Sequence, residues 1–157
     1  MRVFLGILMI LVINAKTTAQ ENTSISWLTF EQLEDSLAVK SKKVFINFYA
    51  DWCVYCKKMD QAAYKDVKVM AILKEEYYAV KMNVETRDTI NFNGDSFVNV
   101  EFGKKRNPVH EIPLLLASRE NIPFSLPAII LLNEDFQITN RYFEYISPKR
   151  MRIVLEN

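Results

Sequence analysis

The chain contains two cysteines, Cys53 and Cys56, in a Trp-Cys-Val-Tyr-Cys-Lys run over 52–57. The run follows an apolar, β-branched and aromatic stretch at 44–50, which predicts a buried strand. A short turn after this strand would place Cys53 in the exposed first turn of the next helix, where unpaired backbone N–H groups and the helix dipole stabilise a thiolate. Because a thiol three residues further on lies within one helical turn, the pair can close a small reversible ring. The sequence therefore predicts dithiol–disulfide exchange.

Two other interpretations of the cysteine pair are open. The pair could be half of a zinc site, but structural zinc takes four protein ligands and His110 is the one further soft ligand in the chain. It could also be a static disulfide, although a bridge over so short a loop stabilises little. We interpret His110 as an ordinary surface or helix-cap residue, with a catalytic role as the minor alternative.

The N-terminus has the pattern of a secretory signal peptide. Arg2 precedes an apolar run over 3–13, and a polar stretch with small residues ends at Ala19. The apolar run is shorter than the roughly 20 residues that cross a bilayer, which makes an uncleaved anchor the minority interpretation. No cysteine lies near Ala19, which argues against a lipid anchor. We therefore predict a signal peptide over 1–19 and a periplasmic or secreted product.

Length and charge limit the classes of function. Removal of 1–19 leaves a chain over 20–157, which is enough for one domain with a hydrophobic core. The 20 basic and 19 acidic residues give a formal net charge of +1. This balance gives no sign of nucleic-acid binding, and we expect a monomer. In an oxidising compartment, two closely spaced cysteines favour a working redox pair over a structural staple.

Hydrophobic periodicity and capping residues predict the order of elements on either side of the cysteines. Thr29 and Gln32 have the spacing of a capping box and predict a helix through about Val39. Asp66 is a second candidate N-cap. The remaining expected elements before position 85 are a short strand over 25–28, the strand over 44–50, the cysteine helix to about 63, and a strand over 78–84.

The stretch after position 85 is less regular. Asn93-Gly94 predicts a type I′ turn in a hairpin of 90–92 with 97–100. Asn107-Pro108 is typical of a helix start, and we expect this helix to reach about Ser118 with a bend at Pro113. Beyond it we predict antiparallel strands over 128–132 and 136–143, and a last helix that begins at Ser147-Pro148.

Several of these features together resemble the thioredoxin superfamily. They are the Tyr-Ala-Asp-Trp-Cys-Val-Tyr-Cys-Lys run over 49–57, the strand at 80–85, and Leu126-Pro127. Within the superfamily the motif is most similar to secreted thioredoxin-like proteins and to the C-terminal periplasmic domain of the disulfide reductase DsbD. The resemblance implies an α/β fold with a central mixed sheet flanked by helices. It also marks about 86–122 as an insertion before the cis-proline strand, either a lid or docking surface or a peripheral decoration.

The resemblance assigns roles to the site residues. It makes Cys53 the attacking thiolate and Cys56 the resolving thiol. Pro127 takes the place of a cis-proline that faces the cysteines, and the backbone of Leu126 would pair with a substrate chain. Trp52 would pack beneath the active-site turn and shield it. From its place inside the ring, Tyr55 is either a hydrophobic contact for substrates or ring filler.

Two departures from the thioredoxin pattern concern proton transfer and redox tuning. Thioredoxins carry a buried acid six residues before the first cysteine, where this chain has Asn47, although Lys81 matches the lysine beside that acid. An amide cannot take the proton of the resolving thiol, so that step would rely on water or on Glu85. The second departure is Val54-Tyr55 within the ring, and residues there tune the reduction potential over about −270 to −120 mV across the fold.

The sequence thus predicts a thiol–disulfide oxidoreductase, most simply a periplasmic disulfide reductase that needs no metal or organic cofactor beyond the Cys53–Cys56 disulfide. Its expected partners are protein thiols and disulfides, with a membrane electron donor. One alternative is a disulfide oxidase or isomerase on the same fold. The other is a binding or chaperone-like module in which the cysteines contribute little turnover.

Overall fold

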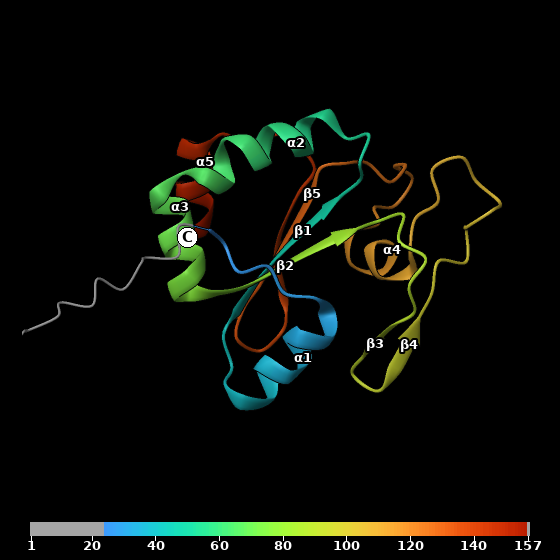
Figure 1. Ribbon diagram of the computed structural model, residues 1–157, viewed down its shortest axis with the longest axis horizontal. Helices are drawn as coiled ribbons and strands as arrows, with labels where there is room; N and C mark the ends of the chain where they lie inside the picture. The colour runs from blue at the N-terminus through green and yellow to red at the C-terminus, as the bar shows by residue number, and fades with distance from the viewer. Residues whose placement is uncertain (1–23, 157) are drawn as a thin grey trace, which may run out of the picture.

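The computed structural model describes residues 24–156. A four-stranded mixed sheet forms the centre of the molecule, with its strands in the order β2-β1-β5-β6 (Figure 1). β1 (Lys43–Tyr49) runs parallel to β2 (Tyr77–Asn83) and antiparallel to β5 (Ala128–Leu132). β5 in turn pairs with β6 (Ile138–Tyr142) in the antiparallel sense. The predicted α/β class and mixed sheet are confirmed.

Helices cover both faces of the sheet. The described helices are α1 (Phe30–Val39), α2 (Val54–Gln61), the short 3-10 helix η1 (Ala63–Lys65), α3 (Val67–Glu76), α4 (Glu111–Ala117) and α5 (Pro148–Glu156). α1 and α4 pack on one face, whereas α2, α3 and α5 pack on the other (Figure 1). Side chains alternate along β1, so Val44, Ile46 and Phe48 enter the first core and Phe45 enters the second. Asn47 therefore points toward the face that carries α2.

The predicted helix starts follow from capping chemistry. The Thr29 side chain accepts from the Gln32 backbone N–H at 3.3 Å, and the Gln32 side chain accepts from the Thr29 N–H at 2.9 Å. The Asp66 carboxylate accepts from two N–H groups of the first turn of α3. Pro148 opens α5, where its missing N–H has no cost. These starts were predicted correctly because the cap and its partner lie within one turn.

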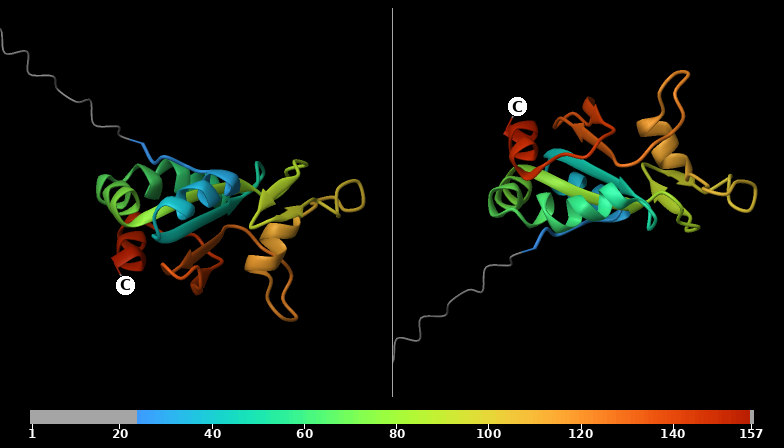
Figure 2. Two further views of the ribbon diagram at one scale, coloured as in Figure 1. Left: turned by 90° about the horizontal axis from the view of Figure 1, so that it is seen from below. Right: turned by 90° about the horizontal axis from the view of Figure 1, so that it is seen from above.

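The insertion projects at the end of the molecule away from α3 and α5 (Figure 2). It holds the hairpin of β3 (Ile90–Phe92) and β4 (Asp95–Phe97). Asn93 and Gly94 have φ angles of 54° and 81°, as a type I′ turn requires. The hairpin is confirmed, but β4 begins at Asp95 because a two-residue turn pairs the strands directly across it.

Three other predictions are corrected. The strand over 25–28 is reduced to one bridge between Leu28 and Val80. His110, not Asn107, is the N-cap of α4, because its side chain accepts from the Ile112 N–H. Pro113 therefore lies in the first turn, where backbone N–H groups have no partner within the helix, and it has no hydrogen bond to break there. The strand predicted over 136–143 is also shorter, since Phe136 lies in the turn before β6.

The predicted signal peptide over 1–19 lies outside the described residues. Among residues 24–156, none of the helices has the length and apolar character needed to cross a membrane.

Candidate functional site

The two cysteines are joined in a disulfide at the start of α2. Cys53 is the N-cap of this helix, and its Sγ accepts from the Cys56 backbone N–H at 3.2 Å. The Cα atoms of the bridged pair are 5.3 Å apart. The Cys53 N–H donates to the Ala50 carbonyl oxygen at 3.0 Å and so closes the turn that links β1 to the helix. The predicted strand–turn–helix placement is confirmed, and a thiolate at Cys53 would lie against free N–H groups at the positive end of a helix.

The disulfide is more buried than the sequence predicted. Cys53 is 4% exposed and Cys56 is 2% exposed, and both belong to the core cluster that lies against β1. The prediction of an exposed Cys53 is therefore wrong for the bridged state, because the ring packs against the sheet. Its neighbours remain on the surface, with Val54 73% and Tyr55 57% exposed. A substrate would meet these two side chains around a nearly covered sulfur.

Trp52 directly precedes Cys53 in the cysteine turn. Its side chain is 51% exposed, and its Nε1–H donates to a carboxylate oxygen of Glu85 at 2.9 Å. This hydrogen bond holds the half-exposed indole at the surface, and the role of Trp52 in packing under the turn and shielding it stays a prediction. Glu85 has no hydrogen bond to Cys56 among the described residues, and its suggested part in proton transfer stays a prediction.

The Leu126–Pro127 peptide bond is cis, as predicted for this position. Pro127 is buried, whereas Leu126 is half-buried and lines a groove of ≈ 90 Å³ together with Trp52 and Glu85. The insertion also lines this groove, at residues 107–109. The structure thus brings together the cysteine turn, the proline loop and the insertion. The role of Leu126 in pairing with a substrate backbone stays a prediction.

Asn47 and Lys81 lie side by side but do not bond to each other. They are register partners on β1 and β2. Asn47 is 1% exposed, and its Oδ1 has no hydrogen-bond partner among the described residues. Lys81 instead forms an ion pair with Asp60 of α2, with 2.6 Å between Nζ and Oδ1. The carboxylate that pairs with Lys81 thus comes from α2 and not from β1.

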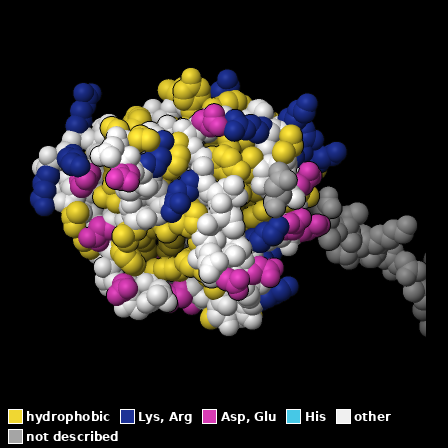
Figure 3. All heavy atoms as spheres, turned by 180° about the vertical axis from the view of Figure 1, so that it is seen from behind, with side chains coloured by type: hydrophobic (Ala, Val, Ile, Leu, Met, Phe, Trp, Pro, Cys, Tyr) yellow, Lys and Arg dark blue, Asp and Glu magenta, His cyan; other side chains and the backbone are white. Residues whose placement is uncertain are grey.

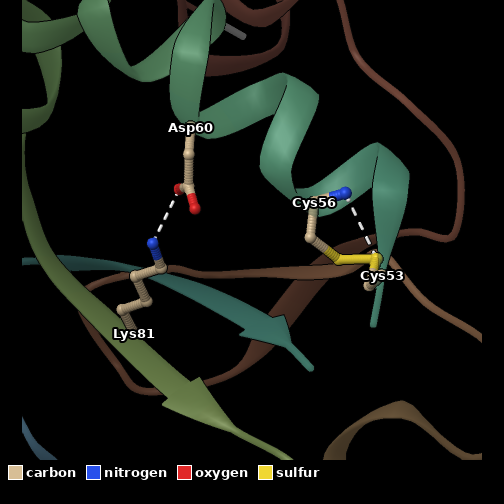
Figure 4. A network of polar contacts seen from close by, with 4 residues as sticks. All are labelled: Cys53, Cys56, Asp60 and Lys81. Atoms are coloured by element: carbon tan, nitrogen blue, oxygen red, sulfur yellow. Dashed lines mark hydrogen bonds and ion pairs between the residues drawn. A yellow bond between two sulfur atoms is a disulfide. The ribbon is translucent and has the colours of Figure 1, made fainter. Parts of the chain in front are cut away.

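Asp60 is the site residue that the sequence analysis missed. It lies four residues after Cys56, so both side chains belong to one face of α2. Figure 4 shows Asp60 pointing from the helix toward Lys81, with Cys56 one turn closer to the start of α2. The Lys81 ammonium also lies 4.8 Å from the centre of the Tyr49 ring. The four-residue spacing from Cys56 was available in the sequence and could have revealed this carboxylate.

The ring of Tyr55 lies near the ring of a second tyrosine, Tyr145. The rings of Tyr55 and Tyr145 are 6.2 Å apart, and the Lys58 ammonium lies 4.7 Å from the centre of the Tyr145 ring. Tyr145 was not predicted, because it lies in the segment before α5, far from the cysteines in sequence. This arrangement leaves Tyr55 at the surface beside the disulfide, where both interpretations of its role stay predictions.

His110 is a helix cap, as predicted, but it is fully buried and not at the surface. Its Nε2 lies 3.2 Å from the Asp88 carbonyl oxygen, while its Nδ1 accepts from Ile112. Burial lowers the pKa of His110 below its ordinary value. Both ring nitrogens therefore serve the insertion and none of their contacts reaches the cysteines. Among residues 24–156, no three metal-ligating side chains gather into a possible metal site.

Comparison with known proteins places this geometry in a family. The sequence pattern of the thioredoxin-like family matches residues 26–116, which include the cysteine turn, α2, β1 and β2. The chain belongs to this family. Membership and the bridged Cys-x-x-Cys pair together place it among the thiol–disulfide oxidoreductases, the class of enzyme predicted from the motif.

Relatives of known function match in the same part of the chain. The thiol:disulfide interchange protein DsbD of Salmonella typhi is 42% identical over 52 residues, which are 32% of this chain and 9% of that protein. DsbD of Escherichia coli K12 is 32% identical over 78 residues, which are 47% of this chain and 14% of that protein. The matched part is thus about a tenth of the length of these relatives.

Solved structures agree on the fold. A thioredoxin from Thermus thermophilus has a TM-score of 0.57 and 18% identity, with 85% of each chain covered. The reduced C-terminal domain of DsbD from Neisseria meningitidis has a TM-score of 0.50 and 17% identity, and the match covers 79% of this chain and 88% of that one. The predicted thioredoxin-like fold is confirmed.

Proposed function

We propose that the protein is a periplasmic disulfide reductase that passes two electrons from the Cys53–Cys56 dithiol to disulfides of other proteins. The observation that carries this proposal is the cysteine pair at the start of α2, with Cys53 as N-cap and its Sγ within 3.2 Å of a backbone N–H. An N–H group directed at the sulfur stabilises a thiolate more than a thiol. Cys53 is therefore the attacking group, and Cys56 one turn later is the resolving group.

The reaction proceeds in two exchanges. The Cys53 thiolate attacks one sulfur of a substrate disulfide, which forms a mixed disulfide and releases the other substrate sulfur as a thiolate. Cys56 then loses its proton and attacks the Cys53 sulfur, which releases the second substrate thiolate and forms the Cys53–Cys56 bridge. The substrate gains two electrons and the protein loses two. No metal or organic cofactor takes part in either exchange.

Proton removal from Cys56 is the step for which the ordinary thioredoxin acid is absent. We assign it to Asp60, whose carboxylate follows Cys56 by four residues on the same face of α2. The Lys81 ammonium, 2.6 Å from Asp60, fixes the position of this carboxylate. Asn47 supplies a buried amide oxygen that has no hydrogen-bond partner between residues 24 and 156. A water molecule that donates to it would complete a proton path of the kind that buried polar groups require.

The direction of electron flow and the compartment also belong to the proposal. Supporting them are the sequence matches to DsbD and the signal-peptide pattern over 1–19. A reductant in an oxidising compartment needs a source of electrons, so we propose a membrane protein that reduces the Cys53–Cys56 bridge after each turnover. The substrates are protein disulfides that reach the groove beside Trp52 and Leu126.

Trapping of the mixed disulfide tests the assignment of the two cysteines. In Cys56→Ser the second exchange cannot occur, so incubation with oxidised insulin should accumulate an insulin adduct on Cys53, detected by non-reducing electrophoresis and mass spectrometry. The control is Cys53→Ser, which should form no adduct. An adduct on Cys56 in that control, or none on Cys53, would contradict the roles assigned here. A protein that binds insulin equally well without either cysteine would instead be a binding module.

A further inference from the structure

A second concave surface lies at the other end of the sheet from the disulfide. It is a hollow of ≈ 380 Å³, within the size range of small-ligand pockets of about 300–1,000 Å³. We call it the acidic hollow, and its lining residues are Glu34, Leu37, Phe92, Asn93, Asp95, Phe97 and Phe136. Seen from behind, the molecule has a hollow with hydrophobic side chains at its floor and acidic side chains near its edge (Figure 3).

The position of the acidic hollow separates it from the redox reaction. Leu132 at the end of β5 is paired with Val44 at the start of β1, and Phe136 follows in the next turn. Cys53 follows the opposite end of β1, after Tyr49. A molecule in the hollow would therefore leave the disulfide free, so a partner could occupy both places at once.

Phe136 takes a left-handed backbone conformation in the turn between β5 and β6, where its N–H donates to the Asn133 carbonyl oxygen. Its φ angle is 59°, in the left-handed region that a bulky residue rarely adopts. Among residues 24–156, the two other non-glycine residues with positive φ are asparagines, which tolerate this region. The conformation places the Phe136 ring 5.6 Å from the ring of Phe92, and both are only partly buried. The two rings thus form an aromatic wall of the hollow.

The charge around the rings identifies the kind of occupant. Two lining residues, Glu34 and Asp95, are carboxylates, and the lining contains no basic side chain. Neither carboxylate forms an ion pair with any residue between 24 and 156. Glu34 accepts one hydrogen bond from the Asn93 N–H at 3.1 Å, which fixes its carboxylate at the edge of the hollow. Aromatic faces and unpaired carboxylates both attract a cation.

We propose that the acidic hollow binds an arginine-bearing segment of a partner polypeptide. The alkyl stem of an arginine would lie along the rings of Phe92, Phe97 and Phe136, and its guanidinium would reach the carboxylates of Glu34 and Asp95. Arginine fits better than lysine, because its planar group stacks on aromatic faces while it donates to carboxylates. The hollow is thus a docking site for a basic partner segment, separate from the exchange site.

A peptide titration followed by ¹H–¹⁵N NMR tests the proposal. The probe is acetyl-Ala-Leu-Arg-Leu-Ala-amide, and the matched peptide carries citrulline, which has nearly the same shape without the charge. We expect saturable shifts at the amides of Phe92, Asp95 and Phe136, with an affinity at least fivefold higher for the arginine peptide. Equal affinity for both peptides, no saturable shift, or shifts centred on Cys53 would overturn the proposal.

Two variants tie the binding to the hollow. Glu34→Gln with Asp95→Asn should weaken the arginine peptide at least fivefold, whereas the control Asp35→Asn, an exposed acid of α1 outside the lining, should not. Phe136→Asn removes the ring but suits the left-handed backbone, so it should fold and lose binding. Unchanged binding in either test variant would contradict the proposal. Reversible self-association abolished by Phe136→Asn, measured by sedimentation equilibrium, would make a second copy the occupant and would also overturn it.

Discussion

The cysteine turn and the insertion both line the groove beside Leu126. They differ in the contacts that hold them in place, which are local in the turn and between distant residues in the insertion. Trp52 comes from a turn closed by contacts within four residues, including the bond from the Cys53 N–H to the Ala50 oxygen. The insertion side, at 107–109, is held by contacts between distant residues. One part of the groove is thus fixed by the local sequence and the other by tertiary structure.

The contacts that hold the insertion show this difference. The His110 N–H donates to the Val84 oxygen at 2.8 Å, which ties the start of α4 to the end of β2. The Val98 N–H donates to the Glu111 carboxylate at 2.7 Å. Because such contacts join segments that share no local motif, we expect the insertion to vary in stability without change to the chemistry of Cys53.

Loss of Cys53 should have the largest effect on activity and should leave the stability of the insertion unchanged. Cys53→Ser removes the attacking sulfur, so the rate of insulin reduction by dithiothreitol should fall by roughly a thousandfold or more, to the uncatalysed rate. Turbidity of precipitating insulin measures the rate. Unchanged turnover in this variant would exclude the exchange mechanism and would show that the cysteine turn is not the site of the activity.

Asp60→Asn should slow the second exchange while substrate attack by Cys53 continues. General-base catalysis contributes about a hundredfold at the low end, so mixed-disulfide resolution should slow by about that factor at neutral pH. The loss should shrink as the pH rises, because hydroxide can then take the thiol proton in place of the carboxylate. Rapid-quench kinetics across pH measures the step. The control is Glu75→Gln, an exposed acid of α3, and an equal loss in that variant would remove Asp60 from the mechanism.

Acid should loosen the insertion through His110. Because burial lowers the folded-state pKa of His110, the unfolded state takes up the proton first, and stability falls as pH drops below the ordinary value of about 6.5. Protonation also removes the Nδ1 acceptor of the Ile112 N–H. Hydrogen exchange at Val98 and Ile112 should therefore quicken below about pH 6.5, beyond the intrinsic pH trend. His110→Gln should flatten this dependence, and an unchanged profile would contradict the assignment.

The smallest effect is expected at the hairpin turn of the insertion. Gly94 has a φ angle of 81°, so Gly94→Ala should lower the free energy of unfolding by about 1 kcal/mol through backbone strain alone. Urea denaturation measures the loss, and Gly94→Asn should retain most of the stability because asparagine tolerates this conformation. A change in reduction potential in either variant would show that the two regions are coupled.

The difference between local and tertiary contacts also explains which features could be predicted from the sequence. The capping box at Thr29, the Asn93-Gly94 turn and the cysteine turn act within a few residues, so their patterns predicted them correctly. The start of α4 was misplaced at Asn107, since His110 is selected as the cap by burial against β2 and by its contact with Asp88. No local pattern contains that information.

Within the site, the prediction was correct for position and incomplete for contacts. The placement of Cys53 and Cys56 and the cis bond at Pro127 were foreseen. The hydrogen bond between Trp52 and Glu85 and the pairing of Lys81 with Asp60 depend on how α2 lies over the sheet. The motif specifies the reacting atoms, whereas the tertiary packing decides which acid pairs with Lys81.

The reduction potential of the Cys53–Cys56 pair tests the central claim most directly. The protein is equilibrated in graded glutathione or dithiothreitol buffers, quenched with an alkylating agent, and the free thiols are counted by mass spectrometry. A disulfide reductase should give a value at or below about −230 mV. A value near about −120 mV would make the protein an oxidant, and a pair that does not exchange reversibly would contradict the redox function altogether.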